Sequence, residues 1–382
     1  MGRLSLIIAD NDVEYLTKFE KFLLVNHPQR FDVFSFSSFC LLSDFLCSAD
    51  KSDILLVDSK MYKKELNFQN IEVVMFLSDD GMELIPEGFE TIAKYQHAER
   101  LVMEILRLYA DKSLKTCMMY GNADTRVVCV YSPIGGVGKT SIAAGCSILC
   151  ARKGMKAFYL NLEEVPSTNL FFCSETEQSF SNVIYHLKGK GSNLGLKLEG
   201  AKCCDLQTGV HFFTPPDSIF EMEELSNHDV VRLVNVLKAS AAYDTVFIDM
   251  SCGLNQRNTA LLGCVDIILL VLAPDDTSTV KTKQLKAGFD MLKHKYGIEL
   301  AGRVITILNK SGNRESSIDK TAFIGSGQVV EIGECKSQAA YGHTAGLVED
   351  AAFLSGLNRL LENVMPRGTA EENEYVRGEF IV

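Results

Sequence analysis

The ten residues from Ser132 to Ser141 constrain the fold of this chain more than any other segment. They read Ser-Pro-Ile-Gly-Gly-Val-Gly-Lys-Thr-Ser, follow the apolar run Val127–Tyr131 and precede the apolar helical segment Ser141–Arg152. Glycines let the backbone curl so that several N–H groups point inward, and the N-terminus of the following helix adds the positive end of its dipole. A strand, a glycine-rich turn and a helix in this order predict a loop that binds phosphate groups.

Each residue of this loop has an expected contact with a bound nucleotide. Lys139 would reach the β- and γ-phosphates, and the hydroxyl of Thr140 would coordinate Mg²⁺. The residues expected to surround the phosphates are Gly135, Gly136, Val137, Gly138, Lys139, Thr140 and Ser141. A glycine-rich turn that holds no ligand is the alternative. The complete Gly-Gly-x-Gly-Lys-Thr run between a strand and a helix disfavours it.

Apolar segments of strand length and helix length alternate along the whole chain. In the first 110 residues, the expected strands are Leu4–Ala9, Phe31–Phe36, Ile54–Val57, Val73–Leu77 and Thr91–Ala93, in five β/α units. Later in the chain they are Arg126–Tyr131, Ala157–Leu160, His211–Thr214, Thr245–Ile248, Ile267–Leu272, Val304–Leu308 and Gln328–Ile332. We therefore predict an α/β protein with two parallel-sheet domains, residues 1–112 and 126–382, and a polar linker at 113–125.

Composition excludes several classes of protein. Of the 382 residues, 47% are hydrophobic and 23% are charged, which is typical of globular domains and not of disordered or fibrous chains. Every apolar run is shorter than the roughly 20 residues that a membrane helix needs, and the first is too short for a signal peptide. The net charge of −11 argues against nucleic acid as a partner. Twelve cysteines without a C-x-x-C pair favour a reducing compartment, so we expect a cytoplasmic protein.

The glycine-rich loop resembles the deviant Walker A motif of the MinD/ParA ATPases, normally written Lys-Gly-Gly-x-Gly-Lys-Ser/Thr. The resemblance covers about residues 126–365 and implies that the ligands are ATP and Mg²⁺ and that the protein is a homodimer. One position departs from the family, because its signature lysine before the paired glycines is Ile134 here. In the family this lysine reaches the nucleotide of the other subunit. Its absence predicts ATP binding with slow or partner-stimulated hydrolysis.

Three further positions match motifs of the same family. Val-Phe-Ile-Asp249 resembles Walker B, which implies that Asp249 and Thr140 hold Mg²⁺. Asn161-Leu-Glu163 stands where the family has an acidic motif that orients the attacking water. Asn161 cannot act as a base, so Glu163 is either its substitute or a solvated loop carboxylate. Asn309 resembles the asparagine that contacts adenine, or is an ordinary turn residue. The candidate catalytic residues are Lys139, Glu163 and Asp249.

Polar residues also follow the predicted strands of the first domain. Asp10 ends the first strand, Asp58 the third, Ser78 the fourth and Lys94 the fifth. Ligands of open α/β sheets bind at such strand ends. The set resembles that of a response-regulator receiver domain, which implies Asp58 as the phospho-acceptor with Asp10, Ser78 and Lys94 around it. The loop after Asp58 lacks the usual Met-Pro pattern, so we favour a receiver-like (flavodoxin-like) domain that is used only for docking.

A receiver-like domain in front of a MinD/ParA-like domain is similar to the order in the TadZ/CpaE family. This resemblance implies a factor that localises tight-adherence (Flp) pilus secretion machinery, with protein components of that machinery as partners. It also implies a polar position or one at the inner face of the membrane. The alternatives are an ATPase that phosphorylation at Asp58 switches, and a ParA-like partition or DNA-associated factor. The amphipathic segment Phe353–Leu361 has few basic residues, so we expect it to pack on the core.

Overall fold

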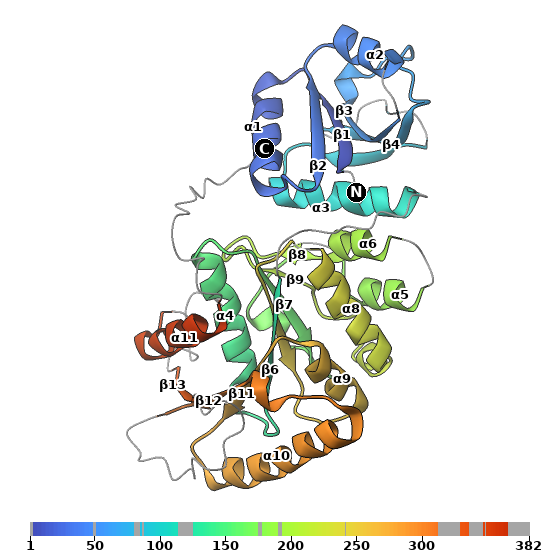
Figure 1. Ribbon diagram of the computed structural model, residues 1–382. Coiled ribbons are helices and arrows are strands. Elements are labelled where there is room, and N and C mark those ends of the chain that lie inside the picture. The colour runs from blue at the N-terminus through green and yellow to red at the C-terminus, as the bar shows by residue number, and fades with distance from the viewer. Residues whose placement is uncertain are drawn as a thin grey trace. The chain divides into compact units, whose positions relative to one another are not determined.

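Figure 1 shows the computed structural model of the protein. The residues that the structure describes are 3–48, 51–79, 85, 88–113, 125–174, 178–189, 193–240, 242–311, 329–335, 347 and 349–365. They form two compact units. The N-terminal unit contains the described residues of 3–113 and 193–201, and the P-loop unit contains those of 125–189 and 202–365. The predicted linker lies outside the described residues except at its two ends.

A parallel sheet in the order β2-β1-β3-β4-β5 forms the centre of the N-terminal unit. Its strands are β1 (Leu4–Ala9), β2 (Phe31–Phe36), β3 (Ser52–Asp58), β4 (Ile71–Ser78) and β5 (Glu90–Ala93). Its helices are α1 (Val13–Asn26), α2 (Phe39–Ser48), α3 (Ala98–Lys112) and α6 (Leu194–Ala201). This strand order is that of flavodoxin-like sheets, which bind ligands at the carboxyl ends of their strands.

The expectation of five β/α units is wrong at one connection. Between β3 and β4 the chain forms a single 3₁₀ turn, Ser59–Met61, and residues 62–70 contain no helix. Aromatic side chains cover this part of the sheet instead. The ring of Tyr62 meets the ring of Phe76 edge-on, with centroids 5.4 Å apart. Since these rings already exclude water from the strands, the connection needs no helix to bury that face.

Helix α6 belongs to the N-terminal unit although its sequence lies inside the P-loop part of the chain. Leu196 is fully buried in the hydrophobic core that β1, α1 and α3 share. Glu199 pairs with Arg30 at 3.4 Å, and both side chains are less than a tenth exposed. A Cβ at Gly200 would lie 2.7 Å from the Cα of Arg107, so α3 and α6 approach closely. The range 126–382, which we predicted as one domain, thus includes one helix, α6, that packs in the N-terminal unit.

The P-loop unit is built on an eight-stranded sheet in the order β13-β12-β11-β6-β10-β7-β9-β8. All neighbouring pairs are parallel except β8 with β9. The strands are β6 (Arg126–Tyr131), β7 (Ala157–Leu162), β8 (Cys203–Cys204), β9 (His211–Phe212), β10 (Thr245–Met250), β11 (Ile267–Leu272), β12 (Val304–Asn309) and β13 (Val329–Ile332). The helices are α4 (Lys139–Arg152), α5 (Phe180–Lys188), α7 (Phe220–Glu223), α8 (Asn227–Ala239), α9 (Gln256–Cys264), α10 (Asp276–Tyr296) and α11 (Ala351–Val364).

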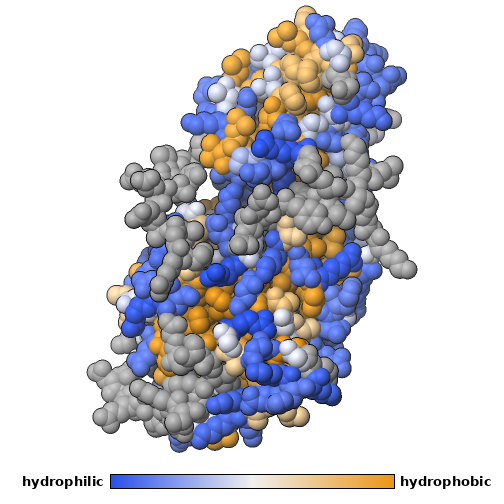
Figure 2. Space-filling view, viewed as in Figure 1, coloured by the Kyte–Doolittle hydropathy of each residue, from blue (hydrophilic) through white to orange (hydrophobic). Residues whose placement is uncertain are grey.

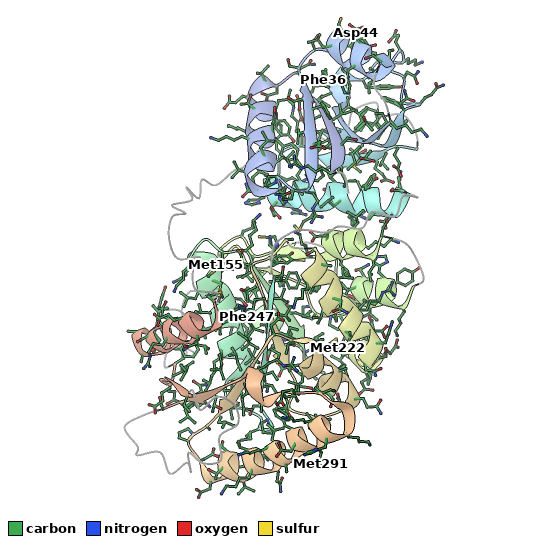
Figure 3. All side chains as sticks on the ribbon, in the orientation of Figure 1. Phe36, Asp44, Met155, Met222, Phe247 and Met291 are labelled. Atoms are coloured by element: carbon green, nitrogen blue, oxygen red, sulfur yellow. The ribbon has the colours of Figure 1, made fainter. Side chains whose placement is uncertain are left out.

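Helices pack on both faces of this sheet, with α4 and α11 on one face and α8 on the other (Figure 1). The core on the α4 side contains Phe247 of β10, which is labelled in Figure 3. A Cβ at Gly145 would lie 2.7 Å from a methyl carbon of Leu357, so α4 and α11 are in close contact. The amphipathic segment of α11 therefore packs on the core, as predicted. No helix in the described part of the chain is long and apolar enough to cross a membrane.

Candidate functional site

The glycine-rich loop joins the central strand β6 to helix α4. The backbone φ angles of Gly136 and Gly138 are +72° and +94°, in the left-handed region that favours glycine. Gly138 is also the residue before the first turn of α4. A Cβ at this position would lie 2.3 Å from Nδ2 of Asn309. Glycine is therefore required at 138 both for the backbone conformation and for space.

Lys139 begins α4, and the contacts that the described residues make with its charged group are weak. Its side chain is 6% exposed. Its Nζ lies 3.2 Å from Sγ of Cys252 and 3.7 Å from Oε1 of Glu163. A thiol is a weak acceptor, and 3.7 Å exceeds the length of a charge-assisted hydrogen bond. The ammonium group can therefore exchange these contacts for phosphate oxygens at little cost.

Asp249 is the next-to-last residue of β10, a strand that is buried along its whole length, and one of its carboxylate oxygens has no hydrogen-bond partner among the described residues. Oδ2 accepts a hydrogen bond from the hydroxyl of Tyr159 at 3.1 Å. Oδ1 is buried and accepts no hydrogen bond from the residues that the structure describes. Burial raises the pKa of Asp249 to about 7, and the charge of Glu163 acts in the same direction, whereas Thr140, Lys139 and Tyr159 lower it. A buried carboxylate oxygen without a donor is suited to a cation.

Glu163 and Asn161 lie at the end of β7 and face different groups. Oε2 of Glu163 accepts a hydrogen bond from the hydroxyl of Thr140 at 3.5 Å, so this carboxylate is part of the site. Burial raises the pKa of Glu163, although Lys139 opposes the shift. The amide of Asn161 instead donates to the hydroxyl of Tyr159 at 3.1 Å. Asn161 therefore supports the residues around it and does not extend toward the loop.

Asn309 and Lys310 connect the end of β12 to the loop. Nδ2 of Asn309 donates to the carbonyl oxygen of Val137 at 2.8 Å, and the side chain is buried. Oδ1 of Asn309 has no hydrogen-bond partner among the described residues. Nζ of Lys310 donates to the carbonyl oxygen of Gly136 at 2.9 Å. Asn309 is thus more than a turn residue, because it holds the loop and keeps one acceptor available.

The donors and acceptors collected here fit a magnesium nucleotide. The positive-φ glycines shape a loop whose N–H groups suit phosphate oxygens. Mg²⁺ takes one or two protein oxygens and keeps several waters, which matches the hydroxyl of Thr140 and Oδ1 of Asp249. Within the described ranges, no group of three or more His, Cys, Asp or Glu side chains could hold a metal ion by itself.

A further network that the sequence analysis missed holds the loop after β10. Arg257 of α9 is buried and donates to Oε1 of Glu164 at 3.1 Å. The same oxygen accepts a hydrogen bond from the hydroxyl of Ser251 at 3.0 Å. Asn258 donates to the Ser251 hydroxyl at 2.9 Å. This network fixes the loop that places Cys252 beside Lys139. An arginine and an asparagine in a short helix give no sequence signal that they are buried.

In the N-terminal unit, the predicted strand-end residues come together around a lysine. Nζ of Lys94 lies 2.8 Å from the carboxylate of Asp10 and 2.8 Å from that of Asp58. All three residues are buried. The other oxygen of Asp58 accepts a hydrogen bond from the N–H of Lys60 at 2.7 Å. Ser78 is buried at the end of β4, and its carbonyl oxygen accepts from the backbone N–H of Lys94 at 2.9 Å.

Two tyrosines lie next to Lys94. Its Nζ is 4.9 Å from the ring centroid of Tyr15 and 5.4 Å from that of Tyr95, within the range of cation–π contacts. Burial lowers the pKa of Lys94, but the hydrogen bonds with Asp10 and Asp58 outweigh this effect and raise it. Burial raises the pKa of Asp10. The lysine is therefore protonated and compensates the negative charge of Asp10 and Asp58.

Comparison with known proteins locates the P-loop unit among ATPase folds. No family model matches the chain. An uncharacterized ATP-binding protein of Methanocaldococcus jannaschii is 27% identical over 217 residues, 54% of this chain and 74% of that protein. A ParA family ATPase from Chlorobium tepidum matches with a TM-score of 0.51 at 16% identity, over 63% of this chain and 99% of its own. The septum site-determining protein MinD from Pyrococcus horikoshii, complexed with Mg-ADP, matches with a TM-score of 0.49 at 19% identity. The match covers 63% of this chain and 96% of the MinD chain. The Chlorobium structure shows that the P-loop unit has the fold of ParA-family ATPases.

Proposed function

We propose that this protein binds ATP with Mg²⁺, hydrolyses it slowly and acts as a spatial organiser resembling the TadZ/CpaE factors of tight-adherence pilus secretion machinery. The observation that carries ATP binding is the convergence of Lys139, Thr140 and Asp249 at the carboxyl ends of β6 and β10, beside a glycine-rich loop. The Methanocaldococcus relative is named an ATP-binding protein, which supports the same ligand. The TadZ/CpaE part is supported by the order of the two units.

The bound nucleotide would supply a γ-phosphoryl group, and Mg²⁺ would neutralise charge that develops on it. Lys139 would hold phosphate oxygens, while Thr140 and Asp249 would hold the cation. Glu163 is the carboxylate available to accept a proton from water. Ile134 packs against the hydrophobic core of the unit, so this position presents no cation to a second subunit. That absence supports slow hydrolysis.

Calorimetric titration with ATP and with ADP, each in the presence of Mg²⁺, tests this proposal directly. We expect the wild type to bind ATP and the Lys139→Ala variant to lose binding, because the amine has no substitute in the loop. Lys153→Ala is the matched control. Lys153 is an exposed lysine that follows the last turn of the same helix, about 20 Å from Lys139. Absence of ATP binding by the wild type would refute the proposal.

We propose further that the N-terminal unit is a receiver-like docking domain for protein components of the secretion machinery. Lys94 already compensates the carboxylates of Asp10 and Asp58, which supports a role without phosphorylation. Hydrophobic side chains reach the surface of this unit in Figure 2. The exposed ones are Val13, Leu24 and Val25 of α1, Leu41 of α2, Phe34 of the edge strand β2 and Tyr95 after β5. Such side chains suit contact with another protein surface.

Exposure to a small phosphodonor such as acetyl phosphate, with Mg²⁺, distinguishes docking from regulation by phosphorylation. We expect the mass of the intact protein to stay unchanged. A mass increase of one phosphoryl group that Asp58→Asn abolishes would instead favour an ATPase that is switched at Asp58. Measured affinity for DNA would favour the other alternative, a ParA-like partition factor. The net charge of −11 argues against this alternative. Sedimentation with and without ATP would test the proposed homodimer.

A further inference from the structure

Strands β7 and β10 place three polar side chains in a short chain of hydrogen bonds. Asn161 and Asp249 are directly opposite each other in the sheet, and Tyr159 lies two residues before Asn161. Residues two apart on a strand point to the same face. The hydroxyl of Tyr159 is 3.1 Å from Nδ2 of Asn161 and 3.1 Å from Oδ2 of Asp249. Tyr159 is fully buried, and Asn161 is 8% exposed.

The direction of each hydrogen bond in this chain follows from its neighbours. The backbone N–H of Glu163 lies 2.9 Å from Oδ1 of Asn161 and can only donate. The amide oxygen of Asn161 must therefore face Glu163, which turns its NH₂ group toward the hydroxyl of Tyr159. Having accepted this hydrogen bond, the hydroxyl has one proton to donate, and Oδ2 of Asp249 receives it. A phenol ordinarily ionises at about pH 10, so the proton stays on the hydroxyl at neutral pH.

We propose that Tyr159 and Asn161 are positioning residues for Asp249: they hold Oδ2 so that Oδ1, which accepts no hydrogen bond from the described residues, is presented to the Mg²⁺ that accompanies ATP. This inference rests on the proposed function. It gives Asn161 a role different from the water-orienting acid that the resemblance places at this position. The residue at 161 must donate a hydrogen bond to the hydroxyl of Tyr159, which an amide can do and a carboxylate cannot.

Replacing Asn161 by aspartate, the residue type of the family, should therefore weaken the site. The introduced carboxylate and that of Asp249 would both be acceptors for the single proton of Tyr159, and one of the two would lose its donor. If position 161 instead acted on metal or water directly, the added carboxylate would strengthen Mg²⁺ binding or speed hydrolysis. The two roles thus predict opposite signs for the same substitution.

The test measures ATP binding by calorimetry over a series of free Mg²⁺ concentrations, and again in EDTA. Removing an outer partner of a metal ligand typically costs about tenfold or more in metal affinity. We therefore expect Tyr159→Phe and Asn161→Asp each to raise the Mg²⁺ concentration for half-maximal binding about tenfold. Binding in EDTA should be unchanged. In the Tyr159→Phe background, Asn161→Asp should cost less than it does alone, because no tyrosine proton remains to be shared.

Tyr243→Phe is the matched control. Its hydroxyl is also buried and hydrogen-bonded, in this case to Nδ1 of His211 at 3.2 Å, and Tyr243 is not among the residues that form the site. Tyr159→Phe and Asn161→Asp could lower the thermal midpoint as this control does and leave the Mg²⁺ concentration for half-maximal ATP binding unchanged. That result would show a structural role only and overturn the proposal. So would tighter Mg²⁺ binding by Asn161→Asp. Absence of ATP binding by the wild type at saturating Mg²⁺ is a separate outcome, which overturns the proposed function and this inference with it.

Discussion

Each unit of this protein places a buried lysine beside carboxylates at the carboxyl ends of parallel strands, but the two lysines have very different partners. Lys94 is 2.8 Å from both Asp10 and Asp58. Lys139 has one carboxylate at 3.7 Å, that of Glu163, and the thiol of Cys252 at 3.2 Å. The positive charge of Lys94 is already compensated by two carboxylates. The positive charge of Lys139 is compensated weakly and can still attract an anionic ligand.

The carboxylates differ in the corresponding way. Asp58 is engaged through both oxygens, by Lys94 and by the N–H of Lys60. Asp249 keeps Oδ1 without a partner among the described residues. Similar residue types at similar strand ends thus produce one site that compensates its own charge and one that is prepared for a cation and an anion. The distances between charges, rather than the inventory of residues, distinguish the two sites.

Lys94→Ala should have the largest effect on stability. Removing one partner of a buried ion pair leaves charge uncompensated, which costs about 3–5 kcal/mol. We expect the free energy of unfolding of the N-terminal unit to fall by this amount in denaturant titrations. We also expect Mg²⁺ to restore part of the loss, since the two aspartates then lack a cation. Lys21→Ala, an exposed lysine of α1, is the control. A loss below about 1 kcal/mol would mean that the lysine does not compensate the site.

Leu196→Ala tests whether α6 is part of the N-terminal unit. Truncating a fully buried leucine costs about 2–5 kcal/mol through lost burial and the cavity that remains. The loss should appear in the unfolding of the N-terminal unit, although residue 196 lies far along the chain from residues 3–113. Near-ultraviolet circular dichroism and hydrogen exchange of α3 would report it. Lys197→Ala on the same helix should change little. Exchange that increases only in the P-loop unit would contradict the assignment.

Gly138→Ala should destabilise the P-loop unit by a smaller amount in the absence of nucleotide. A left-handed backbone costs a residue with a Cβ about 1–2 kcal/mol, and the new Cβ would press on the amide of Asn309. Gly135→Ala is a close control, because a Cβ there would meet no atom within 4 Å. Thermal unfolding measures both variants. Equal midpoints for the two would argue against the conformation described for this loop.

Cys252→Ala should have the smallest effect, and it tests the contrast between the two lysines most directly. A thiol is a weak acceptor, so its loss should change ATP affinity by less than about threefold, or about 0.7 kcal/mol. Competitive displacement of a fluorescent ATP analogue is a suitable measurement. A tenfold loss would show that the thiol positions Lys139, and that this lysine is held as firmly as Lys94.

Much of the architecture could be predicted from local patterns. The runs Leu4–Ala9, Phe31–Phe36 and Ile267–Leu272 are strands with the predicted bounds, and α4 directly follows the glycine-rich loop. These features depend on apolar periodicity and glycine content over a few residues, which neighbouring side chains in space do not alter. The connection after β3 was not predictable in this way, because rings such as Tyr62 replace the helix only once the sheet has formed.

The sequence by itself determined where the glycine-rich loop lies and which strand ends carry acids, since both follow from residue order along the chain. Only the tertiary structure decided what those residues contact. The pairing of Lys94 with two aspartates, the packing of α6 with the N-terminal unit and the direction of hydrogen bonds through Tyr159 all join residues distant in sequence. Such contacts depend on distances of a few ångströms in three dimensions, and electrostatic and hydrogen-bond energies change steeply over that range.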